Sequence, residues 1–441
     1  MPAVHDFARV PVDPTSKAKL AEAGLRYDTL DTGDVPSFNA WARSDLRGFL
    51  APEPSEKDLE GMRASLGYRR TTGVWDNEAP LKDEPVATVS SWPADLTLPG
   101  ARQLTSWAIS SVTVSQARRR RGIARNLLEG ELRTASALAL PLASLTVSES
   151  TIYGRFGFGP ATFAATLSID TRRVLWSGPT PAGRIDYVSR EQWAGQIPEL
   201  FDRVRLATVG EIEGWSGMWP RLAGTVHDED GDGKKLRAIT YVSPDGVLEG
   251  AALFKLEGGE EDYASHTLSV QFVRTASDDA YAALWRFFLE ADLVSTVKAD
   301  HLAIDEPVRW MLGDQRAATV TTTDHQWLRI LDTKAVLEAR RYAVPGAIAF
   351  EVEDALGFAG GSFLLTVGAD GEGKVEELDS LPSEVPAVRL RVDALASLLL
   401  GGVAPASLRA SATLSEATPG AVDLAARMLR VSPEPAPGIW Y

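Results

Sequence analysis

The chain contains no cysteine among its 441 residues. This absence excludes disulfide bonds, thiolate metal sites and any covalent intermediate on a cysteine sulfur. Any group transfer that the protein carries out would therefore have to proceed without a cysteine nucleophile.

Histidine is scarce as well, with five residues that lie in no motif. An acidic stretch at 228–233 resembles the start of a calcium-binding EF-hand loop, but its twelfth position is Ile239 instead of glutamate. We therefore expect a solvated acidic turn here, and no bound metal.

Long apolar runs and an excess of basic residues are also missing. No stretch approaches the ~20 continuous apolar residues of a membrane-spanning helix, and residues 1–6 lack the basic and apolar regions of a signal peptide. We therefore expect a cytoplasmic protein with no membrane partner. The net charge of −15 argues against nucleic acid and favours cationic small molecules or cationic protein segments as partners.

The chain is longer than one hydrophobic core usually supports, so several domains are expected. Its most informative stretch is 107–160. This stretch reads as a β-branched strand at 107–114, an arginine-rich turn, an amphipathic helix at 123–138, a second strand at 142–147 and an aromatic, glycine-rich turn at 148–160.

The arginine-rich turn is suited to anion binding. Because it opens a helix, the first backbone N–H groups lack intrahelical partners and lie at the positive end of the helix dipole. Gly122 and Ala124 would allow the main chain to approach a diphosphate closely, and Arg119 and Arg120 would add charge and forked donors. Without this context, four adjacent arginines more often form a solvated or nucleic-acid-facing run.

In that setting, Arg119-x-x-Gly122-x-Ala124 resembles the signature of GCN5-related N-acetyltransferases (GNAT), which bind acetyl-CoA. The later turn at 152–160 reads I-Y-G-R-F-G-F-G-P and resembles the corresponding turn of the Eis (enhanced intracellular survival) N-acetyltransferases. The resemblance spans essentially the whole chain and implies direct acyl transfer from acetyl-CoA. One departure lies before the pocket-wall segment 49–53, where Gly48 stands in place of an acidic residue of one family member, so the resemblance does not fix the identity of the acceptor.

The resemblance implies roles for single residues. Main-chain groups of Val112 and Val114 would bind the pantetheine arm and the thioester oxygen, and Ser148 would lie near the same arm. Tyr153 would be the general acid for the departing thiolate, since a tyrosine with a pKa of ~10 is protonated at neutral pH. From the residues alone, simple packing of Tyr153 and of both valine side chains remains open.

The resemblance also implies a role for the C-terminus. In the Eis family the C-terminal carboxylate reaches the active site of the first domain, and here the chain ends in P-A-P-G-I-W-Y at 435–441. The resemblance implies that the α-carboxylate of Tyr441 accepts a proton or anchors the acceptor. A flexible terminus without function is the alternative.

The fold class implied is α/β (α+β), with two tandem GNAT-like domains followed by a domain similar to sterol carrier proteins. We assign 1–175 to the catalytic domain, 184–318 to a GNAT-like domain without a cofactor site, and 320–441 to the sterol-carrier-like domain. A strand at 163–169 is placed in the first domain and a strand at 326–332 in the third. An entry strand is expected from Phe7 onward, before the first helices.

The expected function is acetyl-CoA-dependent N-acetylation of primary amines on a cationic acceptor, with an aminoglycoside-like small molecule favoured. Acetylation of protein lysines is an alternative, and so is a non-catalytic role as an acyl-CoA sensor or lipid carrier. The resemblance further implies a homo-oligomer, specifically a hexamer.

Overall fold

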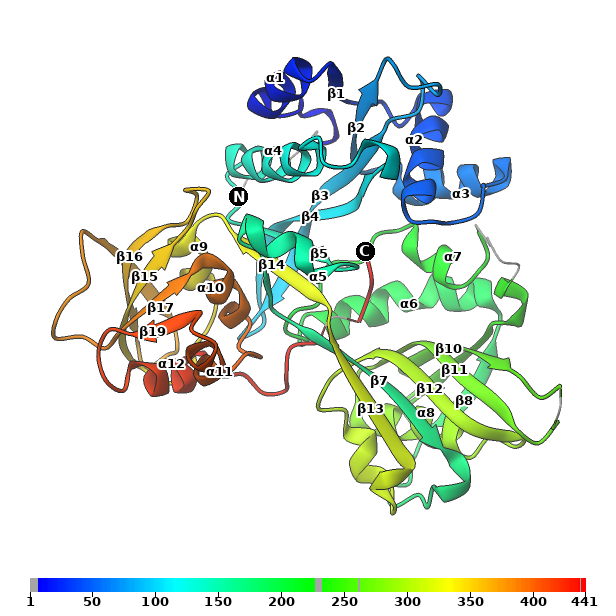
Figure 1. The fold of residues 1–441 in the computed structure, drawn as a ribbon. Helices are drawn as coiled ribbons and strands as arrows, with labels where there is room; N and C mark the ends of the chain where they lie inside the picture. The colour runs from blue at the N-terminus through cyan, green and yellow to red at the C-terminus, as the bar shows by residue number, and fades with distance from the viewer. Residues whose placement is uncertain (1–6, 227–231, 261, 437) are drawn as a thin grey trace. The chain divides into compact units, whose positions relative to one another are not determined.

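A computed structural model describes residues 7–226, 232–260, 262–436 and 438–441. The chain forms two compact units, of which the first contains Met1–Thr162, Asp324–Pro435 and Trp440–Tyr441, and the second contains Phe163–Thr323 and Ala436–Ile439 (Figure 1). Most of the acidic stretch discussed above, residues 228–231, lies outside the described residues. Within the described ranges no helix is long and apolar enough to cross a membrane, and no group of three or more histidine, aspartate or glutamate residues could hold a metal ion.

The first unit contains a seven-stranded sheet in the order β1-β2-β3-β4-β5-β14-β6. Its strands are β1 (Leu25–Thr29), β2 (Arg70–Asp76), β3 (Ala87–Leu98), β4 (Arg102–Val114), β5 (Leu142–Thr146), β6 (Gly159–Pro160) and β14 (Gln326–Ile330). Neighbouring strands are antiparallel, except that β4 and β5 are parallel. Every residue of β2 is buried, as expected of a strand covered on both faces.

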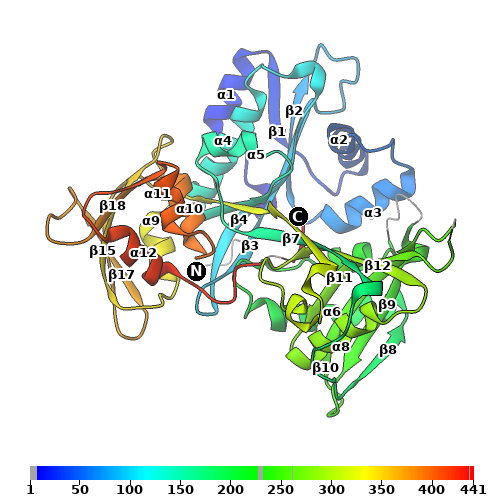
Figure 2. The same cartoon turned by 60° about the horizontal axis from the view of Figure 1, so that its bottom comes forward.

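Helices cover this sheet in two groups (Figure 2). The helices α1 (Pro14–Glu22) and α4 (Ile123–Ala137) lie side by side, and their apolar residues share one large core cluster with the sheet. The helices α2 (Val35–Gly48) and α3 (Glu56–Leu66) form a separate apolar cluster around Trp41. The short α5 (Ser150–Tyr153) follows β5.

The amphipathic pattern of α4 explains why this helix packs where it does. Leu127, Leu128 and Leu132 recur at helical spacing and are fully buried. Each such side chain contributes about 1.5–3 kcal/mol when it leaves water. The burial of this face therefore holds α4 against the sheet.

The first unit also contains a five-stranded sheet in the order β17-β16-β15-β18-β19. Its strands are β15 (Gly346–Glu353), β16 (Gly361–Val367), β17 (Gly373–Leu378), β18 (Ala387–Arg391) and β19 (Leu414–Glu416). The helices of this part are α9 (Thr333–Ala339), α10 (Val392–Leu399), α11 (Pro405–Ala410) and α12 (Ala421–Leu429).

The second unit is built on a seven-stranded sheet in the order β13-β7-β12-β11-β10-β9-β8. Its strands are β7 (Phe163–Asp170), β8 (Arg184–Val188), β9 (Arg237–Val242), β10 (Leu248–Glu257), β11 (His266–Thr275), β12 (Val294–Leu302) and β13 (Ala318–Asp324). The described helices of this unit are α6 (Arg190–Arg205), α7 (Met218–Leu222) and α8 (Asp278–Leu289).

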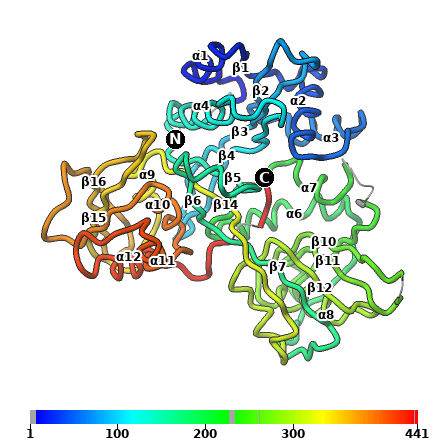
Figure 3. Tube along the Cα trace, viewed as in Figure 1, coloured from blue at the N-terminus to red at the C-terminus, as the bar shows by residue number. Residues whose placement is uncertain are grey.

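Two strands lie in other sheets than the sequence indicated. The strand at 163–169, assigned to the catalytic domain, is β7 of the second unit, where Leu167 pairs with Ala299 of β12. The strand at 326–332, assigned to the third domain, is β14 of the first sheet, where Trp327 pairs with Leu145 of β5 and with Pro160 of β6 (Figure 3). Alternation and β-branching identify a strand but not its partners, because pairing depends on residues far away in the sequence.

The beginning of the chain also differs from the expectation. The first described residues form a short 3₁₀ turn and the helix α1, and the expected entry strand follows only at Leu25–Thr29 as β1. The helix α1 begins with a proline after Asp13, whose carboxylate accepts a hydrogen bond from the amide of Ser16 at 2.7 Å.

Candidate active site

A cavity of about 700 Å³ opens at the end of β4 in the first unit. It is lined by the end of β4, the arginine-rich turn, the start of α4, the segment after β5, and α5. Its lining residues are Gly48, Phe49, Leu50, Val112, Thr113, Val114, Arg118, Arg119, Arg120, Gly122, Ile123, Ala124, Arg125, Ser148, Glu149, Ile152, Tyr153, Arg155 and Phe156. All site residues expected from the sequence belong to this set, except Tyr441.

The edge of β4 next to this cavity is open. The ladder between β4 and β5 joins Trp107 to Ala143 and Ala108 to Ser144, and no strand within the described residues pairs with that edge further along. The pairing with β3 shifts by one residue where Ser111 adopts a left-handed φ of 56°. The backbone at Val112 and Val114 therefore follows a bulge and lies beside the cavity on the unpaired side of the strand.

The arginine-rich turn divides into two pairs of side chains. Arg118 and Arg121 both contact Asp76, at 2.8 and 3.0 Å, and fix the turn to the end of β2. Arg119 and Arg120 are exposed and form no ion pair or side-chain hydrogen bond with any described residue. They are the two arginines that the sequence assigned to the cofactor.

The N-terminus of α4 lies at the cavity without a side-chain cap. Gly122 is the N-cap residue and adopts a left-handed φ of 75°, a conformation that favours glycine. Ile123, Ala124 and Arg125 of the first helical turn line the cavity. Because the first N–H groups of a helix lack intrahelical acceptors, this end of the cavity is suited to a phosphate group.

Tyr153 ends α5, lines the same cavity and is only 6% exposed. Its ring packs edge-on against Phe158, with centroids 6.1 Å apart. Burial, aided by the negative charge of Glu149, raises the pKa of Tyr153 to about 12. The hydroxyl is therefore protonated at neutral pH and is able to donate a proton.

The terminal residue Tyr441 is held at the end of β5. The hydroxyl of Thr146 donates to an oxygen of the terminal carboxylate at 2.6 Å, and Gln326 Nε2 donates to the phenolic oxygen at 3.0 Å. The Tyr441 ring, 6% exposed, packs edge-on against Trp92 at 5.7 Å. Thr146, which holds the carboxylate, is two residues before Ser148 of the cavity lining. Tyr441 itself is not among the residues that line the cavity.

The structure adds site residues that the sequence did not indicate. Thr113 lines the cavity beside Gly48, and a Cβ atom added at Gly48 would lie 2.4 Å from the Thr113 Cβ. The hydroxyl of Thr113 is in turn 2.7 Å from that of Thr88. Position 48 therefore has no room for an acidic side chain unless this threonine pair moves. The departure at Gly48 was the only available signal, because the contact joins residues far apart in sequence.

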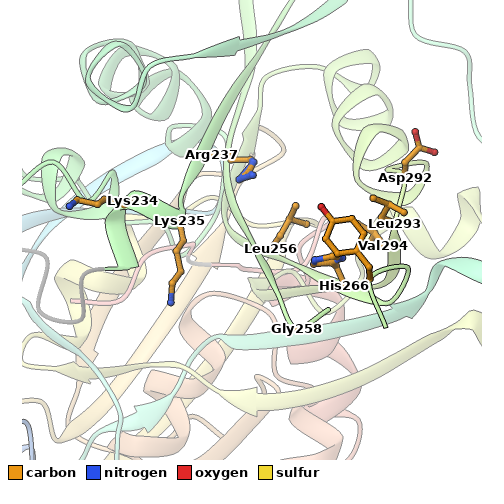
Figure 4. A pocket seen from close by; sticks show the side chains of 10 residues that line it. Lys234, Lys235, Arg237, Leu256, Gly258, His266, Asp292, Leu293 and Val294 are labelled. Atoms are coloured by element: carbon orange, nitrogen blue, oxygen red, sulfur yellow. The ribbon is translucent and has the colours of Figure 1, made fainter. Parts of the chain in front are cut away.

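A second cavity, of about 420 Å³, lies in the second unit (Figure 4). Lys235, Arg237 and His266 contribute polar groups to its lining, and Leu256 and Val294 contribute apolar ones. None of the site residues expected from the sequence lies there. The comparison of the two cavities therefore favours the one at β4 as the active site.

Comparisons with protein families identify the domains of the chain. A GNAT acetyltransferase domain model matches residues 31–161, a second GNAT acetyltransferase model matches residues 211–330, and a sterol carrier protein domain model matches residues 333–438. The fold and the site together define a GNAT acyltransferase with an appended sterol-carrier-like domain.

Individual relatives narrow this class. An uncharacterised N-acetyltransferase of Streptomyces avermitilis is 33% identical over 93% of this chain and 98% of its own length. The N-acetyltransferase Eis of Mycobacterium tuberculosis is 30% identical over 86% of this chain and 90% of its own. The crystal structure of Eis1 from Mycobacterium abscessus, at 26% identity, superposes with a TM-score of 0.77 and covers 95% of this chain and 100% of its own. The chain belongs to the Eis-like family of GNAT N-acetyltransferases.

Proposed function

We propose that this N-acetyltransferase moves an acetyl group from acetyl-CoA directly to a primary amine of a cationic acceptor. The observation that carries the proposal is the clustering of the expected site residues in one cavity, which combines an uncapped helix start, two unpaired arginines and a buried, protonated tyrosine. Because the chain has no cysteine, no cysteine acyl-enzyme lies on the path.

In this proposal the donor's diphosphate lies at the start of α4. Gly122 and Ala124 leave the backbone accessible, and Arg119 and Arg120 supply charge-assisted hydrogen bonds. The open edge of β4 at Val112 and Val114 supplies main-chain partners for the pantetheine arm and the thioester oxygen, and Ser148 faces the same arm.

Tyr153 is the proposed general acid. Its raised pKa keeps the hydroxyl protonated at neutral pH, so that a proton is available for the departing thiolate. The terminal carboxylate of Tyr441 is the proposed proton acceptor or anchor for the cationic amine, since Thr146 holds one of its oxygens. The role of Tyr441 is testable by C-terminal amidation, which neutralises the charge with almost no added volume. An amidated enzyme with full kcat would refute that role.

The acceptor is proposed from charge. A net charge of −15 favours a polycationic small molecule such as an aminoglycoside, with protein lysines as the competing acceptor class. We further propose a cytoplasmic homo-oligomer, specifically a hexamer. A monomer in sedimentation experiments at micromolar concentration would contradict this assembly.

The experiment that tests the function measures free thiol release from acetyl-CoA with a panel of aminoglycosides, simple amines and lysine peptides. We expect turnover with the polycationic small molecules, and Tyr153→Phe should lower kcat by ~10² or more with little change in the KM for acetyl-CoA. Turnover with peptides alone would identify a lysine acetyltransferase. Binding of acyl-CoA without turnover for any amine would favour the carrier or sensor role.

A further inference from the structure

A buried arginine connects the turn after Tyr153 to the five-stranded sheet of the same unit. Arg329 on β14 is fully buried, and its Nε donates to the carbonyl of Phe156 at 2.6 Å. Its Nη1 donates to the carbonyl of Ile330, and its Nη2 donates to both carboxylate oxygens of Asp354, at 2.7 and 2.8 Å. The guanidinium is thus held on three sides.

Asp354 is itself fixed by the loop that joins β15 to β16. Its carboxylate accepts hydrogen bonds from the amides of Leu356, Phe358 and Ala359, at 3.1, 2.9 and 2.9 Å. Burial acts to raise the pKa of Asp354, but Arg329 and these amides outweigh it and hold the pKa below its usual value. The carboxylate therefore stays charged, and the loop presents it to Arg329 in one orientation.

The other end of the connection is the turn that carries the proposed acid. Phe156 lies three residues after Tyr153, is buried, and lines the cavity. A Cβ atom added at Gly157 would lie 2.8 Å from Arg329 Nε, and one added at Gly159 would lie 1.9 Å from the carbonyl of Asp393 in α10. The turn therefore packs directly on β14 and on the sterol-carrier-like part, with no space for side chains at either glycine.

We propose that Arg329 and Asp354 are positioning residues for Tyr153, so that a loop of the sterol-carrier-like domain sets the geometry of the catalytic turn. The proposal rests on the acid role of Tyr153 given above. It assigns this third part of the chain a task in acetyl transfer that requires no bound lipid.

Stability alone is a weak reason for such an ion pair. Replacing both members of a buried pair by apolar residues is often neutral or stabilising, because the desolvation of two charges offsets their attraction. Unlike an apolar side chain, a forked guanidinium forms directional hydrogen bonds, and these fix the carbonyl of Phe156 relative to Asp354. Its contribution is therefore expected in the placement of Tyr153.

The test is a double-mutant cycle between Arg329→Met and Tyr153→Phe in the full-length protein. In the parent, Arg329→Met should lower kcat by ~10-fold or more, because displacement of a catalytic group by about 1 Å is costly. The KM for acetyl-CoA should stay within about twofold, as no cofactor contact is removed. In the Tyr153→Phe background, Arg329→Met should lower kcat by less than about twofold, because the group that it positions is already absent.

Two further variants keep the result interpretable. Arg340→Met removes an equally buried arginine of the same part, which binds the carbonyls of Leu398, Leu399 and Leu429 but not the catalytic turn, so kcat should stay near the parent value. Asp354→Asn keeps one acceptor oxygen and should lower kcat less than Arg329→Met does. It takes the place of Arg329→Met in the cycle if that variant does not fold.

The outcomes separate the two proposals. Equal losses for Arg329→Met, or for Asp354→Asn, in both backgrounds would overturn the positioning role while leaving Tyr153 as the acid. An unchanged kcat in both variants would overturn it as well. Full turnover in Tyr153→Phe alone would overturn the acid role and the positioning role together.

Discussion

At the scale of single residues, neighbours with the same chemistry differ in what they contact. Arg118 and Arg121 hold Asp76, whereas Arg119 and Arg120 face the cavity and have no partner among the described residues. Hydrogen bonds from the Glu78 amide, Arg118 and Arg121 lower the pKa of Asp76. The four arginines thus comprise a structural pair and a pair available to a ligand.

This division gives the first prediction. Arg119→Ala with Arg120→Ala should raise the KM for acetyl-CoA by ~10-fold or more, since each charge-assisted contact is worth about 1.5–3 kcal/mol. The melting temperature should hardly change. Arg118→Ala with Arg121→Ala is the matched control and should lower the melting temperature, because Asp76 loses both guanidinium partners and keeps only the amide of Glu78. An unchanged cofactor KM in the first variant would contradict the diphosphate site.

A second prediction concerns Glu306 in the second unit. Burial raises the pKa of Glu306 to about 7, although a hydrogen bond with the Tyr281 hydroxyl acts in the opposite direction. The folded protein therefore keeps a proton that the unfolded chain releases near pH ~4.5. The resulting stabilisation is complete below that pH, declines as the pH rises toward 7, and is absent above.

Glu306→Gln should remove this dependence. Relative to the parent, the variant should gain stability on the order of 2 kcal/mol between pH 5 and pH 8. Thermal melts of both proteins across that range would measure the difference. Parallel pH profiles for parent and variant would show that Glu306 does not titrate in this window.

Sequence reasoning succeeded at the residue scale where the signal was local. Arg119, Gly122 and Tyr153 lie in short patterns tied to one turn each, and the structure brings them to one cavity. Their roles remain predictions. Arg329 was not identified, because its contact with Phe156 joins residues 173 positions apart and leaves no periodic or local pattern.

At the scale of elements, strongly periodic segments were predicted well. The helix expected at 123–138 is observed as Ile123–Ala137. In the sterol-carrier-like part, α11 and β19 were not identified from the sequence, and they have only six and three residues. Elements this short bury too few side chains to give a clear pattern.

The C-terminal segment supports a third prediction. In the second unit, the amide of Gly438 donates to Glu211 at 2.8 Å, and a Cβ atom added at Gly438 would lie 0.9 Å from Arg274 Nη2. Gly438→Ala should therefore displace the end of the chain and withdraw the Tyr441 carboxylate from Thr146. We expect a loss of amine acetylation of ~10-fold or more with a normal KM for acetyl-CoA.

The matched control for this variant is Gly195→Ala in α6, where an added Cβ meets no atom within 4 Å. It should leave activity unchanged and slightly raise stability, because alanine is the better helix former. Normal amine acetylation by Gly438→Ala would argue against a role for the terminal carboxylate.

At the scale of the whole molecule, the two units are not consecutive pieces of chain. Most of the second unit, Phe163–Thr323, is inserted between Thr162 and Asp324, and β14 returns to the first sheet after it. The family models matched contiguous stretches, and so did the domain limits expected from sequence. Neither reveals this arrangement, because it is a property of strand pairing.

The arrangement gives a fourth prediction. A chain ended after Thr162 lacks β14, so the edge of β5 and the short β6 lose their partner strand. Such a chain should be aggregation-prone and should fail to bind acetyl-CoA, although it contains every proposed cofactor residue. Size-exclusion chromatography and calorimetric titration would measure this. A soluble fragment with normal cofactor affinity would show that β14 is dispensable.

The position of β14 also has a consequence for synthesis on the ribosome. Gln326–Ile330 leave the exit tunnel only after Phe163–Thr323 have been made, and until then the sheet that carries the cavity lacks its sixth strand, which joins β5 to β6. During translation, the edge of β5 that pairs with β14 therefore stays unpaired while the second unit is synthesised and begins to fold. Any delay in translation between these segments would lengthen that exposure, so the yield of active enzyme should depend on elongation speed and on chaperones that bind unpaired strands.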